Sequence, residues 1–242
     1  MFDIFFYFVT IIGILFFGIS KGGFGGPIAI LSIPIMSLAM SPITAAGILL
    51  PLLIIMDFVA IYIYWNQWDL KNIKIIIPAA IIGILIGSLT FRFINEDGIR
   101  IIIGCIAITF VFLSLIQKIN FLIKPTKMKG FFWSTISGYT SFVIHAGGPP
   151  INIYLLPQRL NKTLYMGTIT LVFLIINLIK LMPYYYLGLL VIPNLKISLI
   201  LSPLAPLSIY LGYYLHQKVS EKIFYNFIYL FLFKGGIKLI YD

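Results

Sequence analysis

The chain has 242 residues, of which 61% are hydrophobic and only 10% are charged, and its mean hydropathy is +1.07. About a quarter of the residues in a soluble domain are charged, so this composition excludes a water-soluble globular protein. A spanning helix needs about 20 apolar residues, and we therefore expect a single all-α integral membrane domain over residues 1–242. The net charge of +10 indicates membrane orientation rather than a nucleic-acid partner.

Ten apolar runs follow one another along the chain. They lie at 3–20, 28–40, 43–65, 75–91, 101–117, 131–145, 149–157, 167–190, 197–215 and 223–240. The first run lacks the basic start and the cleavage site of a secretory signal, so we expect it to be a retained membrane segment.

The two halves of the sequence carry the same landmarks at offsets of 120 to 125 residues. The matched residues are Gly25-Gly26-Pro27 with Gly147-Gly148-Pro149, Gly47 and Asp57 with Gly167 and Asn177, and Pro78, Gly87 and Glu96 with Pro203, Gly212 and Glu221. Such periodicity indicates duplication. We predict repeats over 3–117 and 131–240, joined by the basic linker 118–130.

Each repeat begins with a segment that fits no standard membrane span. Residues 3–40 without the glycine break 21–27 would form a helix of about 46 Å, too long for one crossing and too short for two. A glycine-tipped re-entrant hairpin fits this length, because non-helical backbone is tolerated where it lines a cavity. A single broken span is the alternative.

With the hairpin, three transmembrane helices complete each repeat and make the crossing number odd. The two repeats are then inverted, and both termini lie outside. Both models obey the positive-inside rule when the linker is cytoplasmic. The linker carries Lys118, Lys124, Lys127 and Lys129, which would attract the anionic lipid of that leaflet.

The two glycine-rich breaks are candidates for an anion site. Backbone N–H groups at helix N-termini favour anions, and close helix packing through small residues is the alternative. The residues expected to approach the substrate are Lys21, Gly22, Gly23, Gly25, Gly26, His145, Gly147 and Gly148. Thr140, Ser141 and Asn152 are further polar candidates.

Lys21, Asp57 and Lys180 lie within apolar runs, where each charge costs at least about 2.5 kcal/mol and indicates function. Lys21 would add a full charge beside the first glycine tip, and His145 would donate to the anion or titrate. Asp57 would carry a proton or act as a gate, because burial favours a neutral carboxyl. Asn177 is its repeat partner, and Lys180 lies one turn further on the same helix face.

These three residues are therefore expected to couple or gate transport. A purely structural ion pair between Asp57 and Lys180 is the alternative. The aromatic groups Tyr62, Tyr64, Trp65, Trp68 and Tyr184 to Tyr186 are typical of interfacial belts, and His216 is expected in a solvated loop.

Together these motifs resemble the TauE/SafE sulfite-exporter family over nearly the whole chain. The resemblance rests on KGGFGGP, Pro51-Leu52-Leu53 with Asp57, HAGGPP, Gly167-Thr168 and Asn177-xx-Lys180. It departs from the family pattern at Pro27, where a further small residue is expected. The resemblance implies a membrane permease for small sulfur-containing or carboxylate anions, such as sulfite, sulfoacetate or related sulfonates.

We therefore expect a multi-pass secondary transporter of the cytoplasmic (inner) membrane that exports a small anion, with protons as a candidate coupling ion and without a cofactor or a metal. An anion channel or a permease for another small carboxylate is the alternative. An intramembrane enzyme is disfavoured, because Asp57 is the only carboxylate within an apolar run. The sequence carries no Walker A, HExxH or Cys-cluster motif, and it does not predict an oligomeric state.

Overall fold

The computed structural model describes residues 3–25, 27–93, 98 and 126–218, and this part of the chain is almost entirely helical. The helices are α1 (Ile4–Ile19), α2 (Ser32–Met36), α3 (Pro42–Ile63), α4 (Leu70–Thr90), α6 (Lys127–Ile144), α7 (Gly148–Leu155), α8 (Lys162–Tyr186), α9 (Ile192–Leu201) and α10 (Leu204–Lys218). Short turns join them: the π-helical η1 (Ser20–Phe24) and the 3-10 turns η2 (Pro27–Leu31), η3 (Phe91–Phe93) and η4 (Leu156–Gln158).

Two of the expected spans and most of the linker fall outside this description. The expected helices at 101–117 and 223–240 lie outside the described residues, as do linker residues 118–125. Helix α6 begins at Lys127, so the last four residues of the expected linker are helical. Thr126 caps that helix by accepting a hydrogen bond from the Lys129 N–H at 3.3 Å.

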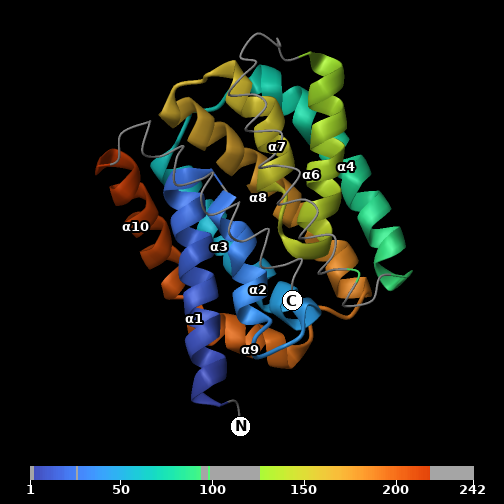
Figure 1. Cartoon of the computed structure of the whole chain (residues 1–242), viewed down its shortest axis with the longest axis vertical. Helices are drawn as coiled ribbons and strands as arrows, with labels where there is room; N and C mark the ends of the chain where they lie inside the picture. Colours follow the sequence, from blue (N-terminus) through green and yellow to red (C-terminus); the bar gives the residue numbers. More distant parts are fainter. Residues whose placement is uncertain (1–2, 26, 94–97, 99–125, 219–242) are drawn as a thin grey trace.

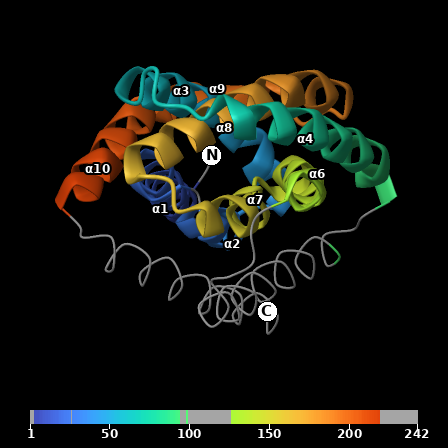
Figure 2. The same ribbon diagram turned by 90° about the horizontal axis from the view of Figure 1, so that it is seen from above.

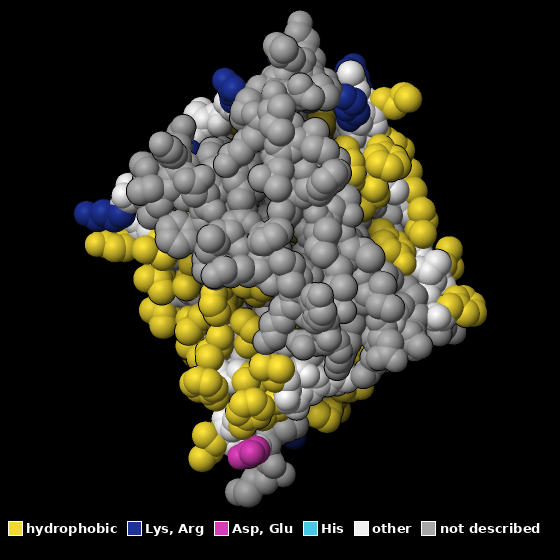
Figure 3. Space-filling model, in the orientation of Figure 1, with side chains coloured by type: hydrophobic (Ala, Val, Ile, Leu, Met, Phe, Trp, Pro, Cys, Tyr) yellow, Lys and Arg dark blue, Asp and Glu magenta, His cyan; other side chains and the backbone are white. Residues whose placement is uncertain are grey.

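Among the described residues, four segments are long and apolar enough to cross a membrane: Ile4–Phe24, Pro42–Ile63, Leu70–Thr90 and Lys162–Tyr186. Helices α9 and α10, bent by 50° relative to each other, add a fifth if they form one span. Large apolar side chains such as Leu85, Leu89, Leu199 and Leu207 are exposed on these helices, and hydrophobic side chains cover much of the flanks (Figure 3). A multi-pass membrane protein buries such surfaces in lipid.

Each glycine break turns the chain back on itself. After η1, Gly25 adopts a left-handed φ of 66°, and α2 returns beside α1, with Met36 packed against Gly13. We call α1, η1, η2 and α2 hairpin 1. After α6, His145 adopts a φ of 55°, and α7 returns along α6 until Tyr154 covers Gly130. We call α6 and α7 hairpin 2.

The two hairpins enter the molecule from opposite ends. Helix α1 begins at the end that holds the N-terminus, whereas α6 begins at the other end, and their tips approach each other in the interior (Figure 1). Seen from above, the hairpins lie next to each other, with α8 packed beside them (Figure 2). The chain therefore reverses direction at each of the two glycine breaks.

Helices from each half of the chain cover the hairpin of the other half. Helix α4 packs along α6, and α10 packs along α1 and η1. Helices α3 and α8 contact each other and begin alike, since Ser41 and Asn161, 120 residues apart, are both N-caps that accept from the backbone N–H three residues on. Pro78 lies within a continuous α4, whereas its match Pro203 lies at the bend between α9 and α10.

Candidate functional site

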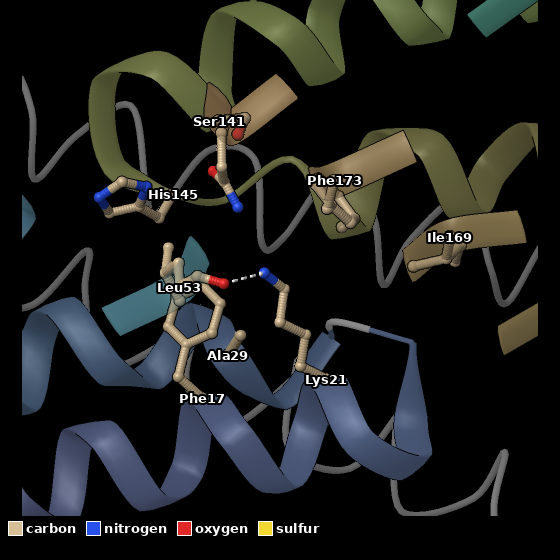
Figure 4. A pocket seen from close by; sticks show the side chains of 10 residues that line it. Phe17, Lys21, Ala29, Leu53, Ser141, His145, Ile169 and Phe173 are labelled. Atoms are coloured by element: carbon tan, nitrogen blue, oxygen red, sulfur yellow. Dashed lines mark hydrogen bonds between the residues drawn. The ribbon is translucent and has the colours of Figure 1, made fainter. Parts of the chain in front are cut away.

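A small cavity of about 20 Å³ lies where the two hairpin tips meet α3 and α8. Its polar lining includes Lys21 of hairpin 1, Ser141 and His145 of hairpin 2, and Asn177 of α8. Figure 4 shows Lys21 reaching from hairpin 1 towards the side of the cavity formed by hairpin 2. The remaining lining residues are Phe17, Ala29, Leu53, Gly148, Ile169 and Phe173.

The ion pair at this site joins Lys21 and Asp57. The Lys21 Nζ lies 2.5 Å from Asp57 Oδ1 and donates to the backbone oxygen of Leu53 at 3.3 Å (Figure 4). Both side chains are buried, with 4% and 0% of their surface exposed. The alternative expected from the sequence, an ion pair between Asp57 and Lys180, is therefore wrong. The π turn at η1 directs Lys21 towards α3, and an amide separates Asp57 from Lys180.

That amide belongs to Asn177, which lies 120 residues after Asp57 and was matched to it in the sequence. The Asn177 Nδ2 donates to Asp57 Oδ2 at 2.7 Å, and Asn177 Oδ1 accepts from Lys180 Nζ at 3.1 Å. One amide thus bridges the carboxylate of α3 and the ammonium of α8. The two matched positions expected to act together are in direct contact.

Neutral acceptors surround the ammonium of Lys180. Its Nζ lies 2.7 Å from the backbone oxygen of Ser141, 2.7 Å from His145 Nδ1 and 3.1 Å from Asn177 Oδ1, with a longer contact to Ser141 Oγ at 3.3 Å. An ammonium has three N–H groups and accepts nothing. These three shorter contacts therefore use all of its donors.

This contact also defines the protonation of His145. Because an ammonium only donates, His145 Nδ1 must accept from it, and the N–H must sit on Nε2, which lies 3.0 Å from the backbone oxygen of Ala46. His145 is then neutral and uses both nitrogens. His145 lines the cavity at the second glycine tip, but in this arrangement it holds Lys180 and has no N–H left for an anion.

Most of the glycines of the first break are packed against protein. A Cβ at Gly22 would collide with the backbone oxygen of Ile209, and one at Gly23 with that of Gly212. Gly25 needs its positive φ, and a Cβ there would meet the ring of Tyr165. Close helix packing, the alternative considered for these positions, accounts for Gly22 and Gly23, whereas the left-handed φ accounts for Gly25.

The other predicted substrate-binding glycines are Gly26, Gly147 and Gly148. Gly26 lies outside the described residues. Gly148 lines the cavity, and Gly147 precedes it as the N-cap of α7, with its backbone oxygen accepting from Ser137 Oγ at 2.7 Å. Among the predicted glycines, the structure therefore places Gly148 on the cavity wall.

Backbone donors are scarce at both tips. Pro149 and Pro150 occupy the first turn of α7 and carry no N–H. In hairpin 1, the Ala29 N–H is already bonded to Ser20 Oγ at 3.1 Å. Positive charge at the cavity therefore comes mainly from lysine side chains and less from helix N-termini.

Three residues that the sequence placed in belts or loops support the tips from inside. Tyr64 and Tyr184 are buried, and their hydroxyls donate to the backbone oxygens of Gly22 and Phe142 at 2.7 and 2.6 Å. His216 lies in α10, is buried, and places Nδ1 3.0 Å from the backbone oxygen of Gly23. The belt assignment of Tyr64 and Tyr184 and the loop assignment of His216 are wrong.

The neighbouring residues Tyr62, Trp65, Tyr185 and Tyr186 are exposed, as an interfacial belt requires.

Asn152, a further candidate, connects the two hairpin tips. Its side chain donates to the backbone oxygen of Gly25 at 3.4 Å and accepts from the Tyr165 hydroxyl at 2.7 Å. The spacing of 120 residues between Tyr64 and Tyr184, equal to that between Asp57 and Asn177, was the signal in the sequence that could have identified the buried tyrosines.

The site holds two buried lysines and one buried carboxylate. With Lys21 and Lys180 protonated, Asp57 ionised and His145 neutral, it carries one positive charge in excess. An uncompensated charge within a membrane protein is costly, and a small anion would balance it. Within residues 3–25, 27–93, 98 and 126–218, no group of His, Cys, Asp and Glu side chains could hold a metal ion.

Comparison with known proteins identifies the family of the chain. A family model described as sulfite exporter TauE/SafE matches residues 10–239. No curated protein and no solved structure matches the chain. The family match covers hairpin 2, all of hairpin 1 except residues 4–9, and all the residues of the polar network, and it confirms the resemblance found in the sequence.

Proposed function

The chain belongs to the TauE/SafE sulfite exporter family and is a membrane transporter, and we propose that it exports sulfite or a closely related small sulfur-containing anion. The observation that carries this proposal is the presence of two buried lysines and only one buried carboxylate beside a cavity of about 20 Å³. A cavity of this size holds one or two water molecules. It therefore suits a compact anion better than a carboxylate with a long carbon skeleton.

Lys21 is the proposed anion ligand. It lines the cavity, is paired by charge with Asp57 and donates one N–H to the backbone oxygen of Leu53, which leaves it able to donate to an anion. The Ser141 side chain and the amide of Asn177 lie on the same cavity wall and can add polar contacts. Lys180 supplies a second positive charge from behind Asn177 and His145, and Gly148 allows close approach to the start of α7.

Two inverted repeats would explain how the site is reached from both sides. We propose that residues 3–117 and 131–240 are such repeats, each with a hairpin that re-enters the membrane. The opposite entry of the hairpins and the shared contacts at an offset of 120 residues support this arrangement. In many transporters, repeats of this kind meet at a midplane site and move against each other. The buried Lys21, Asp57 and Lys180 fit a carrier that closes the site on both sides.

The distribution of basic residues supports an orientation in the inner membrane. One end of the molecule, where α4, α6 and α8 begin and α10 ends (Figure 1), carries Lys71, Lys74, Lys127, Lys129, Arg159, Lys162 and Lys218. We propose that this end is cytoplasmic. The membrane potential then favours anion exit, by about 2.3 kcal/mol per charge at 100 mV.

Asp57, Asn177 and Lys180 are proposed to couple transport to protons. Asp57 is a fully buried carboxylate, and its only charged partner among the described residues is Lys21. Asn177 connects it to Lys180 in the other half of the chain. A change in the charge of Asp57 would therefore affect both halves.

Reconstitution in proteoliposomes tests this function. The full chain should move sulfite in a saturable, proton-sensitive manner and should prefer it to sulfonates and carboxylates offered in a panel. Lys21→Met should abolish the flux, while Lys196→Met, a matched change at an exposed lysine of α9, should leave it unchanged. An ohmic, non-saturating current would identify an anion channel instead.

A further inference from the structure

The two lysines of the site differ in their freedom to change partners. All three N–H groups of Lys180 are used by Ser141, His145 and Asn177. Lys21 is held by Asp57 Oδ1 and the backbone oxygen of Leu53, and it borders the cavity. Lys21 therefore has an N–H group available for an anion that enters the cavity, and its contact with Asp57 can be replaced.

The two oxygens of Asp57 also differ. Oδ2 accepts a short hydrogen bond of 2.7 Å from Asn177. Oδ1 is paired with Lys21 by charge but receives no well-aligned hydrogen bond from any residue that the structure describes. If Lys21 turns away, Oδ1 loses its counter-charge, whereas the bond from Asn177 to Oδ2 survives. Oδ1 is thus the position at which a proton can replace Lys21.

No other described group near Asp57 is placed to take up that proton. Hairpin 1 presents Lys21 to Asp57, and α8 presents Asn177 with Lys180 behind it. His145, at the end of α6, has both nitrogens engaged. On α10, His216 is directed to the backbone oxygen of Gly23.

We propose that the transported anion and Asp57 compete for the ammonium of Lys21, and that uptake of one proton on Asp57 Oδ1 transfers Lys21 to the anion. This inference rests on the proposed function. The proton comes from water on the side from which the anion enters; the Lys21–Asp57 contact breaks, and a Lys21 N–H donates to an anion oxygen. Lys180 keeps its three neutral partners throughout.

The direction of coupling follows from this exchange. Proton uptake raises the charge of the site from +1 to +2, which a dianion neutralises completely. The proton and the anion then occupy the site together and move in the same direction. An exporter of this kind carries one proton outward with each dianion, driven by the anion gradient and the membrane potential and not by the inward proton gradient.

Infrared difference spectroscopy on the purified full chain tests the exchange. Sulfite binding is first measured by calorimetry, and spectra are then recorded with and without sulfite. The C=O band of a protonated carboxyl should appear on sulfite addition and shift in deuterated water. It should be lost in Asp57→Asn and kept in Asp3→Asn, a matched change at an exposed aspartate.

Proteoliposomes with a trapped pH indicator give the second measurement. At a pH well above the second pKa of sulfurous acid, where released sulfite stays a dianion, a sulfite gradient should acidify the compartment that sulfite enters, by one proton per sulfite dianion, beyond the change in protein-free vesicles. Asp57→Asn, which is neutral at all pH values, should deliver no protons with the sulfite that still enters, whatever its remaining flux. The wild-type chain alone decides the question if that variant does not fold.

The outcomes separate the two claims. Sulfite binding without the carboxyl band, or alkalinisation of the receiving compartment, would overturn the exchange at Lys21 and leave sulfite transport standing. Absence of sulfite binding and flux in the wild-type chain would overturn the proposed function, and the exchange with it.

Discussion

Tyr64 and Tyr184 make the same contact in the two halves of the molecule. Each hydroxyl donates to a backbone oxygen 42 residues earlier in the chain, that of Gly22 at 2.7 Å and that of Phe142 at 2.6 Å. Each tyrosine lies near the C-terminus of a central helix, and each acceptor lies just before a hairpin tip. The two bonds fasten the tips of hairpins 1 and 2 to α3 and α8.

Removing either hydroxyl should loosen its tip. Tyr64→Phe and Tyr184→Phe keep the ring and leave one buried carbonyl without its partner, which costs about 1 to 3 kcal/mol. We expect a lower thermal unfolding midpoint in detergent for both variants. Tyr186→Phe, at an exposed tyrosine, is the matched control and should unfold like the wild type. Equal midpoints in all three variants would exclude a supporting role for these bonds.

The glycines of the first break should respond to substitution as packing residues. Gly23→Ala places a methyl group against the backbone of Gly212, so η1 and α10 must separate. Gly188→Ala is the comparison, because Gly188 has a φ of 70° and nothing within 4 Å of its Cβ position; only the backbone strain of about 1 to 2 kcal/mol applies there. We expect Gly23→Ala to be the less stable variant by thermal unfolding.

The opposite ranking, or a Gly23→Ala protein that is fully stable and has lost only sulfite binding, would instead support direct anion contact at this position. Gly25→Val is less informative for this purpose. Its positive φ and the nearby Tyr165 ring predict misfolding whether or not Gly25 touches the anion.

His145 should be replaceable by asparagine but not by alanine. The position needs a left-handed φ, which asparagine tolerates better than alanine, and the asparagine side-chain oxygen can accept from Lys180. We expect His145→Asn to retain more stability than His145→Ala and to keep sulfite affinity within about tenfold of the wild type, measured by calorimetry. If His145 contacts the anion directly, both variants should lose affinity equally.

The composition and the glycine-rich and polar breaks between apolar runs were enough to predict the helical membrane fold and the positions of the two chain reversals. The residues Lys21, Asp57, His145, Asn177 and Lys180 also come together at one site, because intramembrane polar groups are expensive and gather where they can bond to one another. The family follows from the motifs around them and is confirmed by the match over residues 10–239.

The pairing within that site could not be read from the sequence. Lys180 is one turn from Asn177, so helix periodicity suggested Asp57 as its partner, but the π turn brings Lys21 to Asp57 instead. The glycine motifs align at an offset of 122, whereas the left-handed turn residues Gly25 and His145 are 120 apart. Side-chain direction at a broken helix depends on tertiary contacts, and sequence spacing does not encode them.

The orientation of the chain is a further prediction. Residue 2 and the C-terminus should face outside, and the segment near Lys127 should face the cytoplasm, because α1 and α6 begin at opposite ends and the lysines lie with α6 (Figure 1). Single cysteines introduced at these positions in a Cys105→Ser background can be labelled with an impermeant reagent in whole cells. Labelling of residue 2 and residue 127 from the same side would contradict the inverted arrangement.

The assignment of the ion pair gives the last prediction. Removing Lys21 leaves the carboxylate of Asp57 buried without a counter-charge, so Lys21→Met should cost about 3 to 5 kcal/mol of unfolding free energy. Lys180→Met should cost less, because its partners Ser141, His145 and Asn177 are neutral and the change also removes a buried charge.

Double variants separate the two lysines. Asp57→Asn leaves Lys21 unpaired, and adding Lys21→Met should restore stability towards the wild-type value, since both charges are then gone. Adding Lys180→Met to Asp57→Asn should not restore it, because the stranded ammonium is that of Lys21. The measurement is the free energy of unfolding for all five variants under one condition.

Because an anion can replace Asp57 beside Lys21, sulfite should stabilise Asp57→Asn more than it stabilises the wild-type chain. It should not stabilise Asp57→Asn combined with Lys21→Met. Recovery with Lys180→Met alone would show that Asp57 is paired with the cation of α8.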